Sequence, residues 1–372
     1  AVPLETLGHS ALILMADPTG LPALKQELAG HFHDLVPIPT PAAEIEATLL
    51  QVFRQKMTQA ASNSVSPSLS CRTFDYQAAR APAFAIAALF VLFSLLVPQV
   101  VIAFLAFGAL LTLVLFRTLR ITGLLAARRA NQPKIEPQNA APMISMLVPL
   151  YREAEIGKHL LRRLCRLTYP RARMEVLLVL EESDEVTRNA VKCADLPDWF
   201  RVVEVPGDGS LTTKPRAMNY ALNFCHGEII GIWDAEDAPE PDQLEIAAQA
   251  FSHAPPEVAC FQGVLDFYNP TRNLISRCFT LEYAGWFRVL LQGIARLGLV
   301  VPLGGTTLFI RRDALENLGA WDAHNVTEDA DLGAGEEGQG NVFENVFFRR
   351  DNLAHLVHGE DVLAHKLRPQ CH

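Results

Sequence analysis

Residues 228–239 read EIIGIWDAEDAP, an apolar run that ends in three carboxylates within four residues. The run has the length and composition of a buried strand, and Asp234, Glu236 and Asp237 follow where it ends. Carboxylates this close repel one another unless a cation or hydrogen-bond donors neutralise them. They predict a site for Mg²⁺ or Mn²⁺ that also binds substrate phosphates. An acidic helix start capped by Asp237 is the alternative, and the stretch alone does not decide between the two.

The residues around this stretch alternate between continuous apolar runs and amphipathic helical patterns. The runs are MISMLVPL, MEVLLVLE, FRVVEVP and EIIGIW, and helical patterns lie between them, as in KPRAMNYALNF. Such runs are typical of a parallel sheet covered on both faces, in which ligands bind at the carboxyl ends of the strands. The pattern predicts an α/β, Rossmann-like domain over residues 143–333. It has neither G-x-G-x-x-G after its first strand nor a P-loop, which excludes a nucleotide-binding dehydrogenase.

Two more of the predicted strands end in polar residues. Pro149, Tyr151 and Glu153 follow the first run, and Glu181 and Glu182 follow the second. All should line the same crevice as the acidic turn, where a carboxylate can accept hydrogen bonds from a base or ribose. Equally, these carboxylates can be ordinary helix caps.

A predicted helix at residues 214–224 begins with two cations, Lys214 and Arg216. The helix dipole disfavours cations at this end, so they suggest a neighbouring anion such as a diphosphate. Solvated side chains are the alternative.

Further along, Gly304, Gly305 and Thr306 precede an apolar strand, and Glu328 and Asp329 follow in the sequence NVTEDAD. An aspartate held near the reacting atoms can take a proton from an acceptor hydroxyl. Taken alone, the second segment is equally an N-cap formed with Thr327.

The stretch between Arg80 and Arg117 contains no charged residue. A single helix of that length would exceed about 50 Å, against a hydrocarbon core of about 30 Å. Pro98 offers a break, so we expect a transmembrane helical hairpin over residues 81–117 rather than one long buried helix. Basic residues flank both ends, which predicts a bacterial inner-membrane protein whose catalytic domain is cytoplasmic.

The rest of the chain divides by composition. Residues 1–58 alternate short apolar runs with turns and predict a small accessory α/β module. Residues 59–80 and 118–142 are expected to be linkers, the second basic and juxtamembrane, and residues 334–372 form a divergent tail. The apolar but charged stretch 274–303 is either an amphipathic surface helix or a helix covering the sheet. The net charge of −9 argues against a nucleic-acid partner.

Taken in order, VPLYRE, LEESD, TKPRAMNYAL, WDAEDAPEPDQL, FQGVLDFYNP, LGGTTLFIRRDAL and TEDADLG resemble the family 2 glycosyltransferases with a GT-A fold, the group of the cellulose, hyaluronan and chitin synthases. The resemblance implies an inverting hexosyltransferase that uses a divalent metal. Its donor would be a nucleotide sugar, in particular a UDP-sugar, and its acceptor a glycan or a lipid-linked group at the membrane.

The resemblance also implies roles for particular residues. Asp234 and Glu236 match the family's metal-binding DxD pair, with Asp237 beside them, and Asp329 matches the catalytic base. The implied donor-binding residues are Pro149, Tyr151, Glu153, Glu181, Glu182, Lys214, Asn219 and Asp234, and the implied acceptor-side residues are Gly304, Gly305, Thr306 and Glu328.

One family element is missing, because no Gln-x-x-Arg-Trp motif follows the Thr-Glu-Asp segment. The expectation is that the reading frame is shifted or truncated after Gly333. The rival interpretation of the whole chain is a catalytically inactive membrane protein that binds a nucleotide sugar without efficient transfer.

Overall fold

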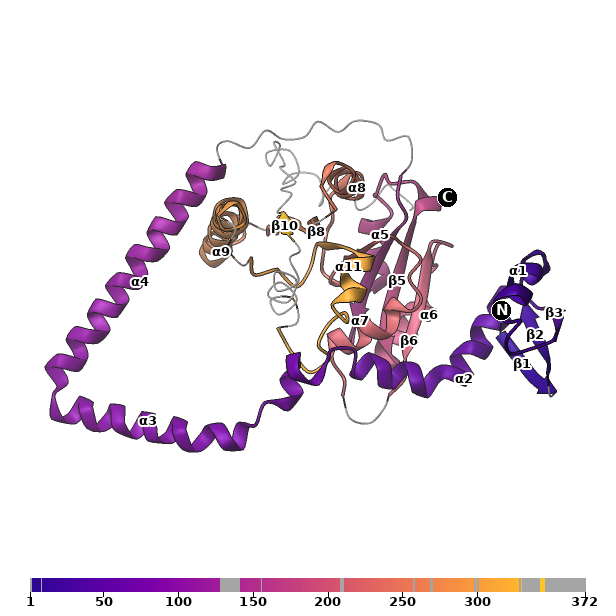
Figure 1. Ribbon diagram of the computed structural model, residues 1–372. Helices are drawn as coiled ribbons and strands as arrows, with labels where there is room; N and C mark the ends of the chain where they lie inside the picture. The colour runs from indigo at the N-terminus through magenta and orange to yellow at the C-terminus, as the bar shows by residue number, and fades with distance from the viewer. Residues whose placement is uncertain are drawn as a thin grey trace. The chain divides into compact units, whose positions relative to one another are not determined.

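The computed structural model describes residues 2–7, 9–127, 141–154, 156–207, 211–256, 258–267, 270–297, 299, 301–327, 329 and 342–344. The chain forms two compact units, Ala1–Ala60 and Ala61–His372. Each is described by itself. Figure 1 labels the elements of both.

The first unit contains a three-stranded sheet. Strands β1 (Val2–Leu7) and β2 (Ser10–Met15) pair antiparallel, and β3 (Asp34–Pro39) pairs parallel with β2. Helix α1 (Leu21–Glu27) connects β2 to β3, and Leu21 and Leu24 pack on the buried side chains of the strands. Helix α2 (Ala42–Ser62) begins in this unit, and its last two residues belong to the second.

The second unit is built on a seven-stranded sheet of order β10-β8-β9-β7-β4-β5-β6. The strands are β4 (Ile144–Leu150), β5 (Met174–Glu181), β6 (Phe200–Val205), β7 (Ile229–Ile232), β8 (Val258–Gln262), β9 (Leu308–Arg311) and β10 (Val342–Glu344). The central strands β7, β4, β5 and β6 are parallel, as expected. A further strand, β9, runs antiparallel between β7 and β8, so the sheet as a whole is mixed with its central strands parallel.

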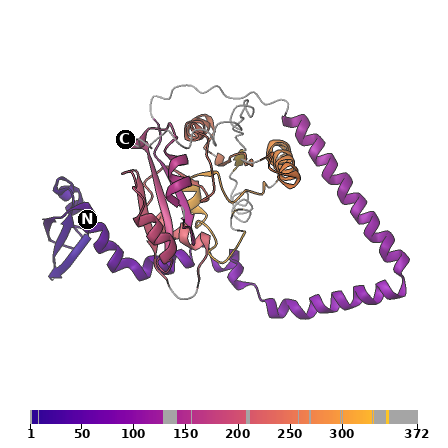
Figure 2. The same ribbon diagram turned by 180° about the vertical axis from the view of Figure 1, so that it is seen from behind.

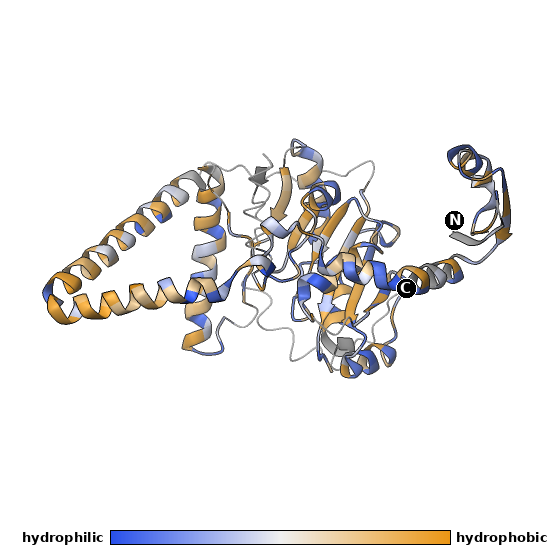
Figure 3. Cartoon of the chain, turned by 60° about the horizontal axis from the view of Figure 1, so that its bottom comes forward, coloured by the Kyte–Doolittle hydropathy of each residue, from blue (hydrophilic) through white to orange (hydrophobic). Residues whose placement is uncertain are grey.

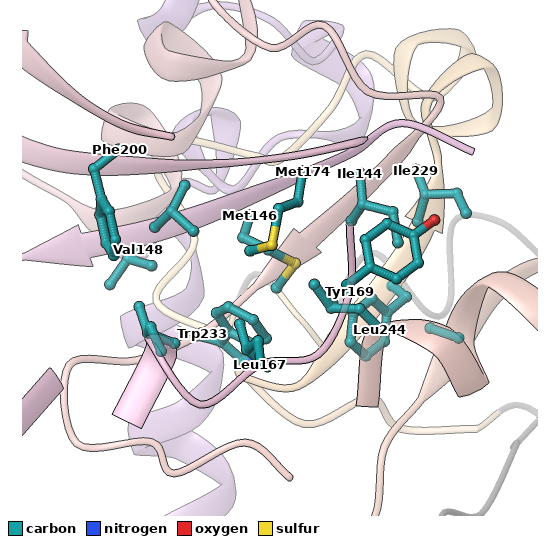
Figure 4. Packing of buried hydrophobic residues seen from close by; sticks show 14 of the residues in the cluster. Ile144, Met146, Val148, Leu167, Tyr169, Met174, Phe200, Ile229, Trp233 and Leu244 are labelled. Atoms are coloured by element: carbon teal, nitrogen blue, oxygen red, sulfur yellow. The ribbon is translucent and has the colours of Figure 1, made fainter. Parts of the chain in front are cut away.

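The apolar runs form central strands because both faces of the sheet are covered. Alternate residues of β4 and β5 enter one large cluster with Trp233 and side chains of α5 (Ile156–Leu164) and α8 (Gln243–His253). Figure 4 shows this packing. The intervening residues Leu147, Leu177 and Val179 are equally buried. Helix α7 (Lys214–Leu222) contacts β4, β5 and β6. Figure 2 shows the sheet and its helices from behind.

The predicted alternative for the acidic turn, a helix capped by Asp237, is not formed. Helix α8 begins only at Gln243, with Asp242 at its N-cap position. Gln243 instead accepts a hydrogen bond of 2.9 Å from the indole of the buried Trp233. This bond holds the end of β7 against α8. The acidic turn between them is not part of either element.

The apolar stretch forms two helices, α3 (Tyr76–Leu96) and α4 (Pro98–Ala127), and the chain breaks at Val97–Pro98 as predicted. Both extend beyond the predicted hairpin of residues 81–117. Helix α3 begins earlier, where the Asp75 side chain caps it at Gln77 and Ala78, and α4 continues to Ala127. Both are long and apolar enough to cross a membrane, and hardly any of their residues are buried. Figure 3 shows the apolar colour along both helices.

Helix α4 packs against the helical stretch formed by α9 (Leu274–Gly285), a π-helical turn (Trp286–Leu290) and α10 (Leu291–Arg296). The crossing needs two glycines, since a Cβ on Gly123 would lie 2.9 Å from the carbonyl oxygen of Val289 and 3.2 Å from the Cα of Gly293. The stretch 274–303, predicted to be either an amphipathic surface helix or a helix covering the sheet, therefore contacts α4 of the hairpin.

The predicted tail and its junction at Gly333 lie outside the described residues, except for β10. This strand pairs parallel with β8 at one edge of the sheet. Most of the predicted juxtamembrane linker, residues 128–140, also lies outside the described ranges.

Candidate active site

The acidic turn after β7 is held by the threonine of the Gly304–Thr306 segment. Asp237 Oδ2 accepts hydrogen bonds from the backbone N–H of Asp234, at 2.8 Å, and from the Thr306 hydroxyl. The Asp234 N–H also lies 3.1 Å from Thr306 Oγ1. Asp237 thus fixes the turn that presents Asp234, while Glu236 is exposed and its carbonyl accepts from Arg163.

Burial raises the pKa of Asp237 to about 6. The hydrogen bonds from Thr306 and the Asp234 N–H act in the opposite direction, and the nearby charges of Asp234 and Glu236 raise the pKa further. This carboxyl is therefore costly to ionise in the absence of a compensating positive charge.

Lys214 reaches this turn from the start of α7. Its Nζ lies 2.7 Å from Asp234 Oδ1 and donates to the Gly305 carbonyl at 2.8 Å. Both members of the ion pair remain about 30% exposed, at 29% and 30% of their side-chain surface. The α7 N-terminus has no side-chain cap. A partly exposed cation at a helix start therefore lies against a partly exposed carboxylate at a strand end, which is an arrangement suited to a bound diphosphate and its metal ion.

Asp329 also lies close to this group, beside Gly305. A Cβ on Gly305 would lie 3.3 Å from Asp329 Oδ2 and 3.8 Å from Lys214 Nζ. The glycine keeps open the space between these two side chains, which any larger residue would fill. Lys214, Asp234, Gly305, Thr306 and Asp329 are thus brought together, as the sequence predicts.

A residue missed by the sequence interpretation holds the glycine segment in place. Gln262, at the end of β8, is buried and accepts from the Gly304 N–H at 2.7 Å while donating to the Thr306 carbonyl at 3.0 Å. Thr307 follows with φ of 54°, in the left-handed region. The available signal was a polar residue ending a fully apolar strand.

The ends of β4 and β5 form a second group around Asp184. This buried carboxylate accepts from the Arg152 N–H at 2.5 Å and from the Thr187 hydroxyl at 2.6 Å. Burial works to raise its pKa, but these hydrogen bonds outweigh the effect and lower it. The Glu153 N–H donates to Thr187. Asp184, which the sequence interpretation left unassigned, therefore ties the two loops together.

The remaining residues expected near the base or ribose differ in exposure. Pro149 and Glu153 are half-buried, whereas Tyr151 is exposed with the Arg152 guanidinium 5.1 Å from its ring centroid. Glu182 is half-buried and donates its backbone N–H to the Val205 carbonyl. Glu328 lies outside the described residues.

Glu181 lies in a buried ion pair rather than on an open surface. Its two carboxylate oxygens are each 3.3 Å from Arg216 Nη1, and neither side chain is exposed by more than 6%. Arg216 also donates to Ser62 and to the Pro206 carbonyl. The same correction applies to Arg216, which the sequence suggested as an anion contact, because its guanidinium is enclosed by protein.

Replacing Glu181 with glutamine should destabilise the protein more than it weakens donor binding. The change strands the Arg216 charge in the interior and should cost about 3 kcal/mol of unfolding free energy. Glu204→Gln is the control, since its pair with Arg188 is partly exposed and contributes at most about 1 kcal/mol. Denaturant unfolding in detergent measures both. Unchanged stability with reduced donor affinity would instead make Glu181 a donor contact.

The Asn219 side chain is also buried and hydrogen-bonded within the protein. Its amide nitrogen lies 3.0 and 2.7 Å from the carbonyl oxygens of Ala61 and Trp321 and 2.8 Å from Ser64 Oγ, so its two N–H groups are shared among these three acceptors. Its amide oxygen accepts from the Trp321 N–H. The side chain predicted to bind the donor is therefore occupied in joining three segments of the chain.

Among the residues that the structure describes, no three His, Cys, Asp or Glu side chains converge as a protein-only metal cage would require. The predicted set Asp234, Glu236 and Asp237 is therefore not a three-carboxylate cage. Mg²⁺ and related ions commonly take only one or two carboxylates and complete their coordination with substrate phosphates and water. The exposed part of Asp234, beside the uncapped start of α7, fits this second kind of site.

A sequence model of the family described as "Glycosyltransferase like family 2" matches residues 141–340. The match covers the whole described sheet except β10 and continues past Gly333.

Curated relatives are similar over the same part of the chain. The beta-monoglucosyldiacylglycerol synthase of Trichormus variabilis is 29% identical over 214 residues, which are 56% of this chain and 44% of the relative. The probable glucomannan 4-beta-mannosyltransferase 1 of Arabidopsis thaliana is 27% identical over 206 residues, 54% of this chain and 37% of the relative. The chain thus spans less than half the length of these relatives.

A solved structure of mannosyltransferase PcManGT from Pyrobaculum calidifontis, in complex with GDP-Man and Mn²⁺, is similar in fold. It has a TM-score of 0.48 and 22% identity, covering 65% of this chain and 66% of that one.

Proposed function

Because the chain belongs to the glycosyltransferase family 2, as the match over more than half of its length shows, we propose that it transfers a hexose from a nucleotide-diphosphate sugar to an acceptor hydroxyl with inversion. The observation that supports this most directly is the meeting of Lys214, Asp234 and Asp329 around Gly305. A cation, an acidic turn and a separate carboxylate are the groups that such a transfer needs.

In this proposal the two side chains beside Gly305 have different tasks. Lys214 binds the diphosphate, whose charge grows as the sugar bond breaks. Asp329 takes the proton from the acceptor hydroxyl. The hydroxyl oxygen then attacks the anomeric carbon from the face opposite the departing diphosphate, which inverts that carbon.

The proposed metal, Mg²⁺ or Mn²⁺, would be held by Asp234, with Asp237 or Glu236 nearby and the donor phosphates completing the shell. It would neutralise charge on the departing diphosphate. Burial, to which the nearby charges of Asp234 and Glu236 add, raises the pKa of Asp237, so a cation bound at this turn would favour the ionised carboxylate.

We propose that α3 and α4 anchor the protein in the bacterial inner membrane with the second unit in the cytoplasm. Arg117 and Arg120 at the end of α4, and Arg72 and Arg80 before and within α3, favour that orientation. Exposed apolar residues of α9, including Leu274, Ile275 and Leu281, suit a helix at the lipid surface close to α4.

The native thiol of Cys193 tests the orientation, because it is free, exposed and distant in sequence from the hairpin. With Cys71, Cys165, Cys278 and Cys371 changed to serine, a membrane-impermeant maleimide should label Cys193 in inverted membrane vesicles and not in intact spheroplasts. The reverse pattern would contradict a cytoplasmic catalytic unit.

The function itself is tested with the detergent-solubilised protein and a panel of UDP-, GDP- and dTDP-sugars in the presence of Mn²⁺. We expect release of the nucleoside diphosphate from one donor, a UDP-sugar first, and faster release with a glycan or lipid-linked acceptor. Nucleotide-sugar binding with no release, under conditions that keep the protein folded, would identify an inactive binding protein instead.

A further inference from the structure

We infer that residues 61–71, which precede the membrane hairpin, form a clasp that positions Lys214 and Asp329 relative to each other. This inference rests on the proposed function, because it assigns a role in transfer to residues that touch neither substrate. The segment was expected to be a linker, yet it is bonded to two elements of the site.

The clasp forms hydrogen bonds with helix α7. Its Ala61 carbonyl and Ser64 hydroxyl accept hydrogen bonds from the Asn219 amide, at 3.0 and 2.8 Å. Ser62 Oγ accepts a third from Arg216 Nε at 3.2 Å. Arg216 and Asn219 lie within the helix that begins at Lys214, so these bonds fix the rotation and height of the lysine.

The clasp also forms hydrogen bonds with the loop that leads to Asp329. Asp322 accepts hydrogen bonds from Ser70 Oγ at 2.9 Å and from the Cys71 N–H at 2.7 Å. The Ser64 hydroxyl donates to the Trp321 carbonyl at 3.0 Å, and His324 Nε2 donates to the Ser62 carbonyl at 3.1 Å. One short segment therefore holds residues 321–324 at both ends.

Helix α7 and this loop are also hydrogen-bonded to each other. Thr213 Oγ1, directly before Lys214, donates to the Ala323 carbonyl at 2.7 Å, and the Trp321 N–H donates to Asn219 at 3.1 Å. Trp321, Asp322 and Asn219 are all buried, so the network is shielded from water. Satisfied buried hydrogen bonds of this kind fix one geometry.

Helix α7 begins at Lys214 and the loop containing residues 321–324 leads to Asp329, so the bonds that hold these two elements also position the two side chains. Lys214 and Asp329 both lie beside Gly305, and the proposed transfer requires the donor diphosphate bound by Lys214 and the acceptor hydroxyl deprotonated by Asp329 to meet in one geometry. A misplacement of about 1 Å can reduce a rate by about 10²-fold. Loosening the clasp should therefore reduce the rate of transfer more than it weakens the ground-state binding of the donor.

The segment supplies a matched pair of variants. Ser64→Ala with Ser70→Ala removes the hydroxyl that bonds to Asn219 of α7 and the hydroxyl that bonds to Asp322 of the loop. Ser66→Ala with Ser68→Ala makes the same chemical change at two exposed positions of the same segment, whose hydroxyls bond to each other at 3.0 Å. Ser64→Thr keeps the hydroxyl that Ser64→Ala removes.

We expect the Ser64→Ala/Ser70→Ala protein to have kcat reduced by about tenfold, with donor KM changed by less than about twofold. The control pair should match the unaltered protein, and Ser64→Thr should exceed Ser64→Ala in kcat. Amide hydrogen exchange in the full-length protein should accelerate at residues 214–222 and 321–327, and not in the central strands.

Three results would overturn the inference: an unchanged kcat in the folded double variant, an equal loss in the control pair, or faster exchange across the whole unit, which would mean a purely structural role. If the unaltered protein turns over no nucleotide sugar, the proposed function fails. The exchange pattern then still decides whether residues 61–71 hold the two elements together.

Discussion

Asp329→Asn should reduce sugar transfer by about 10³-fold while leaving donor affinity within about twofold of the unaltered protein. A general base contributes about 10²–10⁴-fold, and an amide of the same shape cannot accept the acceptor's proton. The carboxylate lies beside Gly305 and is not part of the ion pair of Lys214 and Asp234, so its loss leaves that pair in place. An interaction made in the transition state affects kcat and not donor binding.

The measurement compares transfer rate with equilibrium binding of the donor to the same purified protein. Asp195→Asn is a suitable control, since Asp195 is an exposed aspartate in the connection between α6 (Glu185–Lys192) and β6. Loss of donor affinity in step with the rate would give Asp329 a role in metal or donor binding. A full transfer rate in the variant would refute its role as the base.

The residues that sequence could place are those whose role is set by near neighbours in the chain. Asp234 and Asp237 follow a strand whose apolar run identifies it, and a parallel sheet places the carboxyl ends of such strands together. Lys214 is recognisable because a cation at a helix start is unfavourable without an anion. The break at Pro98 follows from proline chemistry alone.

The errors arose where a side chain is satisfied by a distant part of the chain. Asn219 bonds to Ala61, 158 residues away, and Ser64 bonds to Trp321, 257 residues away. The pairing of Glu181 with Arg216 depends on how β5 and α7 pack. Polar residues near a predicted site look like ligands until the structure shows which of them are already bonded.

The direction of β9 could not be predicted from its own residues. Leu308, Phe309 and Ile310 are apolar like the neighbouring strands, and a short apolar run carries no information about strand direction. The reversal brings Thr306 and Thr307, which precede β9, to the carboxyl end of β7, where the Thr307 N–H donates to the Ile232 carbonyl at 2.8 Å. The acidic turn acquires its threonine partner through this antiparallel pairing.

Asp234→Asn is expected to weaken metal-dependent binding of a nucleoside diphosphate by at least about 100-fold. In a site with only one or two protein carboxylates, each ligand charge contributes strongly to the affinity for the cation, and the cation in turn holds the diphosphate. The asparagine can still accept the hydrogen bond from Lys214, so the variant removes charge with little change of shape. Binding of the diphosphate without metal should fall much less, because Lys214 loses a competing anion.

Titration of UDP in the presence and absence of Mn²⁺ separates the two effects, and direct Mn²⁺ binding by electron paramagnetic resonance gives a readout independent of turnover. Glu236→Gln tests the exposed member of the turn, whose carbonyl and not its side chain is bonded to Arg163. A large loss in Glu236→Gln, with little in Asp234→Asn, would move the metal to the exposed carboxylate. If both variants retain full Mn²⁺-dependent binding, the acidic turn is not the metal site, and the Lys214–Asp234 pair serves only to hold α7 against the end of β7.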